Sequence, residues 1–306
     1  MKAMRLVLPL LMAGLACSFL TPQEAAPLPA LPPASVTPAA SAPTAQPVSP
    51  APAADSLLYI SGTTHIESAP KSWPDPETFL AFLQQVTDLG LRWSVGADVG
   101  WLEGEPRAAG IIQQSEALGV QWDVHTHAVQ DRARAAALIT QLGGHPTSVV
   151  SGMLVDEWDA MRQPLTYQGY TWTPQVLWGG TNCPGHRPGC DDLAAGLWIP
   201  LGSGQYQVHD PNGTLIRVGG GTHQLADGLA LAQALADGRY DYPVISFTLM
   251  VMPSTLRIVE SADGIEQIAA FVRQMQAYPF VRWATIAETA QAWQEAGRVP
   301  SRIEMP

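Results

Sequence analysis

Two histidines, His125 and His127, stand at the end of a strand-like run, QWDVHTH at residues 121–127. Successive side chains of a strand point to opposite faces, so these two imidazoles lie on one face and can converge on one ion. The alternative is that each histidine only caps the end of a strand. Because the spacing suits shared coordination, a metal site is the first hypothesis.

A second hydrophobic run, LLYISGTTHIE at residues 57–67, ends in His65 and Glu67 with the same spacing. Two strand ends therefore offer three imidazoles and a carboxylate, a mixture that zinc and similar divalent ions prefer. Catalytic sites of this kind use three protein ligands and leave one position to water. The expected ligands are Glu67, the last side chain of its strand, together with His125 and His127.

His65 is then expected to carry a proton or to orient the site, because an imidazole titrates near neutral pH. Asp98 and Asp123 are candidates to accept hydrogen bonds from the imidazole nitrogens that face away from the ion, although a buried structural role fits them equally. Asp156 and Glu157 end another strand-like run. Adjacent side chains face opposite ways, so only one of these two can point to the site and act as a base.

Strand and helix patterns alternate along the chain from residue 57 onward. Repeated strand–helix units that stop at glycines favour a parallel sheet, open or closed, with helices outside. Seven strands are expected at residues 57–64, 91–95, 120–124, 149–155, 214–218, 244–251 and 281–285. Helices are expected at residues 76–89, 108–118, 130–142, 225–236, 264–277 and 288–296.

Residues from about 158 to 210 break this alternation and are rich in Trp, Tyr, Gly and Pro. We expect an aromatic-rich insertion there, in which most aromatic side chains form a small core. An aromatic face also packs against the apolar face of a sugar ring. The candidates for sugar binding are Trp158, Trp172, Trp178 and Trp198.

The N-terminus has the layout of a secretory signal, since Lys2 and Arg5 precede an apolar run at residues 6–16 that is too short to cross a bilayer. The run ends in GLAC, which resembles the lipobox of bacterial lipoproteins. Residues 1–17 are therefore expected to be a signal peptide and Cys17 the lipidated residue, with a plain signal peptide as the alternative. Such a protein lies in the periplasm or at the cell surface, anchored to a membrane by its lipid.

Residues 18–54 are almost entirely Ala, Pro, Ser, Thr and Val without apolar periodicity, so they are expected to form a disordered linker. Residues 55–306 then form one folded domain of about 250 residues, a usual size for an α/β barrel. The net charge of −11, with only 16 Lys and Arg, disfavours a nucleic-acid partner.

Two cysteines, Cys183 and Cys190, bracket the turn-rich sequence PGHRPG. A disulfide can close a loop of this size, and an oxidising compartment would keep it closed. The alternative is a Cys-His-Cys metal knuckle with His186, which lacks an obvious fourth ligand.

The chain resembles the NodB-like polysaccharide deacetylase superfamily over roughly residues 57–297. The strand ends THIE at 64–67 and HTH at 125–127 stand where this family has its first two motifs, and IRVGGG at 216–221 resembles its third. VRWATIAE at 281–288 looks like the family's last strand and helix. The resemblance implies an α/β fold, a distorted (β/α)7-type barrel, and removal of acetyl groups from N- or O-acetylated sugars.

The family also implies roles for two further residues. Its arginine orients an acidic residue, which gives this role to Arg217, with a surface salt bridge as the alternative. The usual adjacent Asp-Asp pair is absent, and the late strand that normally carries a catalytic histidine, residues 247–254, has none. His223 is the expected replacement for that acid, or else a solvent-exposed residue at the start of a helix.

The expected function is that of an exported, metal-dependent hydrolase that acts on acetylated glycans, with zinc as the expected ion. One alternative is another metal hydrolase or a glycosidase on a (β/α) barrel, which would shorten the glycan instead of releasing acetate. The other is a carbohydrate-binding protein of the same fold without turnover, which the missing histidine leaves open.

Overall fold

The computed structural model describes residues 56–67, 74–183, 190–220 and 223–305, and these form one compact unit within Ser49–Pro306. The expected signal peptide with Cys17 and the expected linker at 18–54 lie outside the described residues. No helix in the described ranges is long and apolar enough to cross a membrane.

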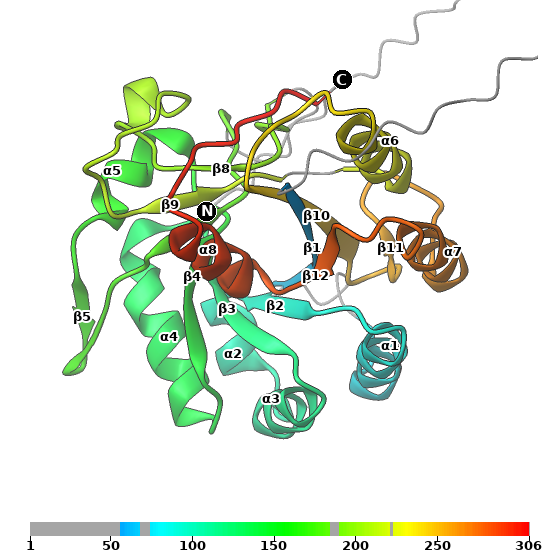
Figure 1. The fold of residues 1–306 in the computed structure, drawn as a ribbon. Helices are drawn as coiled ribbons and strands as arrows, with labels where there is room; N and C mark the ends of the chain where they lie inside the picture. Colours follow the sequence, from blue (N-terminus) through cyan, green and yellow to red (C-terminus); the bar gives the residue numbers. More distant parts are fainter. Residues whose placement is uncertain (1–55, 68–73, 184–189, 221–222, 306) are drawn as a thin grey trace, which may run out of the picture. The chain divides into compact units, whose positions relative to one another are not determined.

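A ten-stranded sheet forms the centre of this unit (Figure 1). Seven of its strands correspond to those expected from the sequence: β1 (Leu57–Ile66), β2 (Trp93–Ala97), β3 (Gln121–His125), β4 (Pro146–Ser151), β9 (Ile216–Val218), β10 (Val244–Met252) and β12 (Val281–Trp283). Three are short strands that the sequence patterns did not reveal: β7 (Val176–Trp178), β8 (Leu197–Trp198) and β11 (Arg257–Ile258). The expected α/β class is confirmed, whereas the sheet has ten strands rather than seven.

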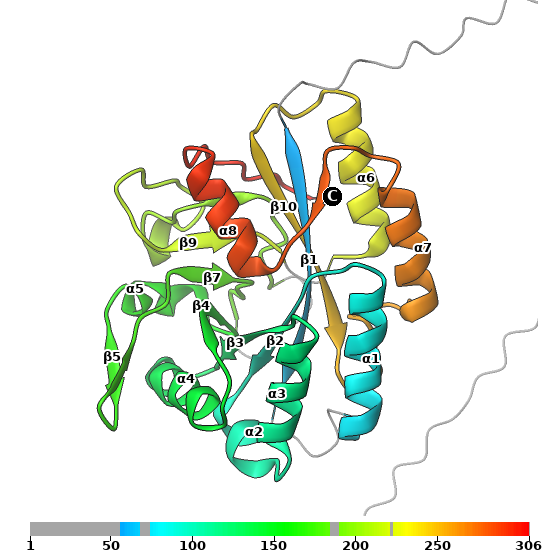
Figure 2. The same ribbon diagram turned by 60° about the horizontal axis from the view of Figure 1, so that its bottom comes forward.

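The strand order is β11-β10-β1-β2-β3-β4-β7-β9-β8, and all neighbours are parallel except the short β8 and β11. The central strand, β1, pairs through residues 57–64 with β10 on one edge. On its other edge it pairs first with β12, through residues 58–60, and then with β2, through residues 62–66. Figure 2 shows β1 and β10 side by side in the middle of the unit.

Helices surround the sheet. Those with bounds near the expected ones are α1 (Pro76–Asp88), α3 (Ala108–Ala117), α4 (Arg132–Gln141), α6 (Leu225–Ala236), α7 (Ile265–Met275) and α8 (Ile286–Glu295); the short α2 (Val99–Gly104) and α5 (Trp158–Met161) were not expected. α8 packs against β1 and β10 and also against β4 and β9, which lie in separate parts of the strand order. The sheet therefore curls, with α8 on its concave side and α1, α3, α4, α6 and α7 outside (Figure 1).

Local sequence explains where these helices begin. Asp75 accepts a hydrogen bond from the Thr78 backbone nitrogen, and Pro76 occupies the first turn of α1, where its missing N–H costs nothing. Thr285 and Glu288 form a capping box at the start of α8.

The expected insertion at about 158–210 is not a single excursion. β7 lies within it and belongs to the main sheet between β4 and β9, while β5 (Leu165–Tyr167) and β6 (Tyr170–Trp172) form a separate hairpin against α4. β4 also differs from expectation, because it ends at Ser151 and not at residue 155. Gly152, with φ +88°, turns the chain away from the sheet at this point.

Candidate functional site

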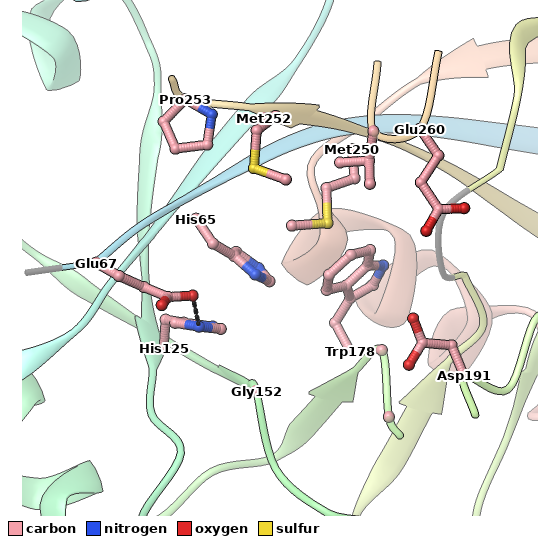
Figure 3. Close-up of a pocket in the computed structure, with 13 residues that line it drawn as sticks. His65, Glu67, His125, Gly152, Trp178, Asp191, Met250, Met252, Pro253 and Glu260 are labelled. Carbon is pink, nitrogen blue, oxygen red and sulfur yellow. Dashed lines mark hydrogen bonds and ion pairs between the residues drawn. The ribbon is translucent and has the colours of Figure 1, made fainter. Parts of the chain in front are cut away.

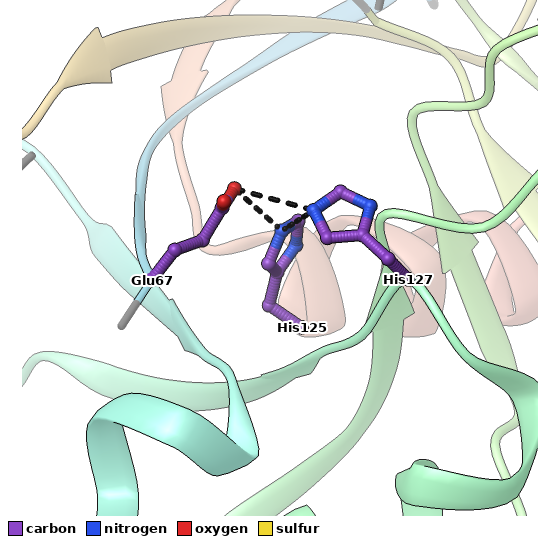
Figure 4. A group of neighbouring side chains, drawn as sticks. All are labelled: Glu67, His125 and His127. Carbon is purple, nitrogen blue, oxygen red and sulfur yellow. Dashed lines mark hydrogen bonds and ion pairs between the residues drawn. The ribbon is translucent and has the colours of Figure 1, made fainter. Parts of the chain in front are cut away.

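The carboxyl ends of four adjacent parallel strands, β1 to β4, meet at one edge of the sheet. Glu67 directly follows β1, His125 is the last residue of β3, and His127 lies two residues beyond. Parallel strands place such ends at a common rim, where ligands gather in α/β folds. The three side chains converge there (Figure 4).

The ligand atoms form a nearly equilateral triangle. Glu67 Oε1 lies 3.2 Å from His125 Nε2 and 3.3 Å from His127 Nε2, and the two Nε2 atoms are 3.2 Å apart. Ligands at about 2.0–2.1 Å from a tetrahedral zinc ion are about 3.3 Å from one another. The triangle therefore fits one face of a tetrahedral site and leaves the fourth position open.

The outer nitrogens of both imidazoles explain why the inner ones suit a cation. His127 Nδ1 lies 3.0 Å from the Gly152 carbonyl oxygen, which can only accept, so Nδ1 carries a proton. In the neutral ring Nε2 then presents a lone pair. His125 Nδ1 lies 3.0 Å from Ser151 Oγ, so the same tautomer is available to it. Two lone pairs and a carboxylate facing one another match the donor set of a divalent ion.

The three residues differ in the direction of their pKa shifts and in their exposure to solvent. Without an ion, the Nε2 atoms of His125 and His127 can carry protons, and hydrogen bonds from them hold the pKa of Glu67 well below its usual range, although burial opposes this. Burial lowers the pKa of His125, and the hydrogen bond to Glu67 raises the pKa of His127. The side chain of His125 is 1 % exposed, whereas His127 and Glu67 are 44 % and 45 % exposed, so the site has a buried floor and an open mouth.

A cavity of about 370 Å³ adjoins the candidate metal site (Figure 3). His65, Glu67 and His125 lie at one end of it, and Asp191 and Glu260 at the other. Apolar side chains form the wall between these ends, and they include Trp178, Met250 and Met252.

His65 lines the cavity beside His125, with ring centroids 4.0 Å apart. Its Nε2 lies 3.1 Å from Ser151 Oγ, and its ring meets Trp178 edge to face at 5.1 Å. On β10, which carries no histidine, Met250 and Met252 reach the cavity. The described lining therefore holds two histidines, His65 and His125.

Arg217 lies away from the cavity lining. It is fully buried and pairs with Asp192 at 3.3 Å, while its guanidinium sits over the rings of Trp158 and Trp198 at 5.4 and 4.9 Å. Arg217 thus holds Asp192 in place, and the preceding residue, Asp191, lines the cavity.

The other proposed acids and bases also lie outside the described lining. His223 is buried and stacks on Phe247 at 5.0 Å, and burial lowers its pKa to about 4. Glu157 accepts a hydrogen bond from the Leu154 backbone nitrogen, and Asp156 is exposed.

Of the four tryptophans proposed to bind sugar, Trp178 is the one that the structure places in the lining. Trp158 and Trp198 pack around Arg217, and Trp172 is buried in the hydrophobic core.

The partners of the imidazoles differ from those expected. Asp98 caps α2 by accepting from the Trp101 backbone nitrogen, and Asp123 is buried with a hydrogen bond from Thr147. The contacts to the outer imidazole nitrogens come instead from Ser151 and Gly152, at the end of β4. Placing that end four residues too late hid both residues from the sequence patterns.

Two cavity residues on the side opposite the candidate metal site were also missed. Asp191 follows Cys190, which forms the expected disulfide with Cys183, with Cα atoms 5.7 Å apart. A residue next to a disulfide is held in place, so its position beside Cys190 could have marked Asp191 as a candidate from the sequence. Glu260 lies just beyond β11, in a left-handed turn with φ +58°, and no sequence pattern marked it.

No protein-family model and no curated protein matches the sequence. Among solved structures, a probable polysaccharide deacetylase from Pseudomonas aeruginosa PAO1 is similar, with TM-score 0.53 and 10 % identity over 82 % of this chain and 96 % of that chain. PuuE allantoinase is similar with TM-score 0.51 and 8 % identity over 79 % of this chain and 92 % of that chain. The fold is thus that of the polysaccharide deacetylase barrels, and the resemblance noted in the sequence is confirmed at the level of the fold.

Proposed function

We propose that this protein is a metal-dependent hydrolase that removes acetyl groups from glycans. The observation that carries the proposal is the triangle of Glu67, His125 and His127 at the mouth of a cavity, on a fold shared with a deacetylase. Zinc is the proposed ion because its coordination geometry matches the triangle.

Each residue has a role that follows from its position. Glu67, His125 and His127 would hold the ion, which when bound supplies a Lewis acid and lowers the pKa of a bound water. His65, beside His125 in the lining, is the proposed proton carrier for the leaving group. Trp178 and Met250 keep water from the apolar wall and orient the substrate.

The charges of the side chains that line the cavity favour an uncharged glycan as the substrate. The described lining has no Lys or Arg, and it carries three carboxylates: Glu67, Asp191 and Glu260. An anionic sugar would lack a positively charged partner among them, whereas the hydroxyl groups of a neutral sugar can donate to Asp191 and Glu260.

We also propose that the protein is exported and lipid-anchored through Cys17, as its N-terminal sequence indicates. Radiolabelled palmitate should enter the wild type, and Cys17→Ser should abolish labelling. Labelling of that variant to the wild-type level would exclude lipidation at Cys17.

Metal analysis of the purified full chain, coupled to acetate release from acetylated chito-oligosaccharides, tests the activity. We expect about one zinc per chain and acetate release that His127→Ala abolishes. Shortened oligosaccharides without acetate would indicate a glycosidase, and binding without product would indicate a carbohydrate-binding protein. Allantoin belongs in the same panel, because PuuE allantoinase matches the fold almost equally well.

A further inference from the structure

We propose that Ser151 is a positioning residue that couples His65 to the candidate metal ligand His125 and fixes the tautomers of both rings. This inference rests on the proposed metal centre, but not on the identity of the substrate.

The hydroxyl of Ser151 lies between the two imidazoles. Ser151 Oγ is 3.0 Å from His125 Nδ1 and 3.1 Å from His65 Nε2. The three residues are 3 %, 1 % and 8 % exposed, so water competes little for these contacts. The two rings themselves lie 4.0 Å apart with an interplanar angle of 32°.

The neighbouring strand leaves room for this arrangement. A Cβ atom on Gly96 of β2 would lie 2.8 Å from His65 Cδ2 and 3.2 Å from the Cβ of His125. Real Cβ atoms do not come as close as 2.8 Å to another atom, so a larger residue here would displace the His65 ring. The paired rings thus depend on three adjacent strand ends, those of β1, β2 and β3, as well as on Ser151 of β4.

Counting protons gives the direction of each hydrogen bond. A neutral His125 that binds an ion through Nε2 carries its proton on Nδ1 and donates it to Ser151 Oγ. Ser151 has one hydroxyl proton, which then points to His65 Nε2. Since Nε2 accepts, the proton of the neutral His65 ring lies on Nδ1. Ligation at His125 therefore selects the tautomer of His65, and His65 in turn supports ligation through Ser151.

Zinc affinity of the full chain, measured with a chromophoric chelator as competitor, tests the coupling. Ser151→Ala should weaken zinc binding about 10- to 100-fold, as loss of a partner that orients a ligand does. His65→Phe keeps a flat ring but no acceptor, and should weaken binding less. Because His65 acts through Ser151, the double variant should bind zinc as Ser151→Ala does. Ser203→Ala is the matched control, since Ser203 lies far along the chain and bonds to Asp159.

Two further measurements separate positioning from folding. Thermal unfolding without zinc shows whether Ser151→Ala remains folded, and Ser151→Thr, which keeps the hydroxyl, should recover most of the affinity. If Ser151→Ala does not fold, His65→Phe decides, because it must still weaken zinc binding.

Three outcomes contradict the proposal or delimit it. Affinity of Ser151→Ala within twofold of the wild type overturns the coupling, and so do additive effects in the double variant. A wild type that binds no zinc overturns both the metal centre and the coupling. A wild type that binds zinc with the expected variant pattern, but releases no acetate, supports the coupling and excludes the deacetylase.

Discussion

At the scale of single residues, the two candidate histidine ligands differ in burial, but both are proposed to bind the zinc ion. His125→Ala and His127→Ala should each weaken zinc binding at least on the order of 100-fold, because removing a ligand costs more than removing its supporting partner. His127→Ala should leave the fold intact, since its side chain is 44 % exposed at a strand end. Zinc per chain after dialysis and circular dichroism provide the measurements.

His145→Ala is the control for these variants. His145 is 89 % exposed and pairs with Glu116, so this variant should retain zinc. Full zinc occupancy in both His125→Ala and His127→Ala would exclude the proposed ligand set.

At the scale of elements, the end of β4 supports the site through its backbone. Gly152 has φ +88°, and a Cβ there would lie 2.7 Å from His125 Cε1 and 2.8 Å from the Thr126 carbonyl oxygen. Gly169 has nearly the same conformation, φ +84°, with nothing near its Cβ position. Both Gly→Ala variants should lose about 1–2 kcal/mol to backbone strain. Only Gly152→Ala should lose more, together with zinc affinity.

Chemical denaturation and zinc titration of the two glycine variants provide the comparison. Equal losses of unfolding free energy and unchanged zinc affinity in both would show that the β4 end does not position His125.

The disulfide belongs to the side of the cavity opposite the candidate metal site. Reducing Cys183–Cys190 opens a short loop and should lower the unfolding free energy by about 2 kcal/mol. Because Asp191 follows this loop and lines the cavity, reduction should raise KM while zinc affinity stays constant. Mass spectrometry without reductant should show no free thiol at either position. A loss of zinc affinity with an unchanged KM would contradict the prediction that the disulfide positions Asp191 in the cavity and leaves the candidate metal site unaffected.

At the scale of the whole molecule, stability should depend on pH through His223. Burial lowers its pKa from 6.5 to about 4, Asp227 opposes this, Arg217 adds to it, and Asp192 opposes it weakly. The unfolded chain therefore binds a proton between about pH 6.5 and pH 4 that the folded chain does not. The contribution of neutral, buried His223 to the free energy of unfolding is fully present above pH 6.5. About 3 kcal/mol of that free energy is lost as the pH falls to 4.

Urea unfolding at several pH values tests this dependence. His223→Phe, which keeps a ring against Phe247, should flatten the profile between pH 7 and pH 4, whereas His145→Phe at the surface should follow the wild type. Parallel profiles for His223→Phe and the wild type would contradict the prediction.

The sequence predicted those features that are encoded locally. Seven strands of the main sheet could be found because hydrophobic runs alternate with helical patterns along the chain. The candidate ligands could be found because side-chain alternation places His125 and His127, and likewise His65 and Glu67, on common faces. β8 and β11 have two residues each, too few to show a period, and β7 lies in the stretch where the alternation of strand and helix patterns breaks. Their positions depend on pairing with distant strands, which no local pattern encodes.

The roles of single residues were harder to predict than the elements. Arg217 precedes a run of glycines, which suggested that it orients an acid at the site, yet its partner is Asp192, 25 residues earlier in the chain. Ser151 was hidden because a hydrophobic run suggested that β4 continued past it. Only the folded chain shows which polar groups face the two imidazoles.

The position of β1 has a mechanical consequence. Any pull on the segment before Ser56 enters the folded unit at the start of β1, which is bonded to β10 on one edge and to β12 and β2 on the other. Hydrogen bonds between parallel strands run across the strand axis, so tension along β1 loads them in shear and all together. Tension on the N-terminal segment would thus load β1, the strand that is paired along both edges and that Glu67 directly follows.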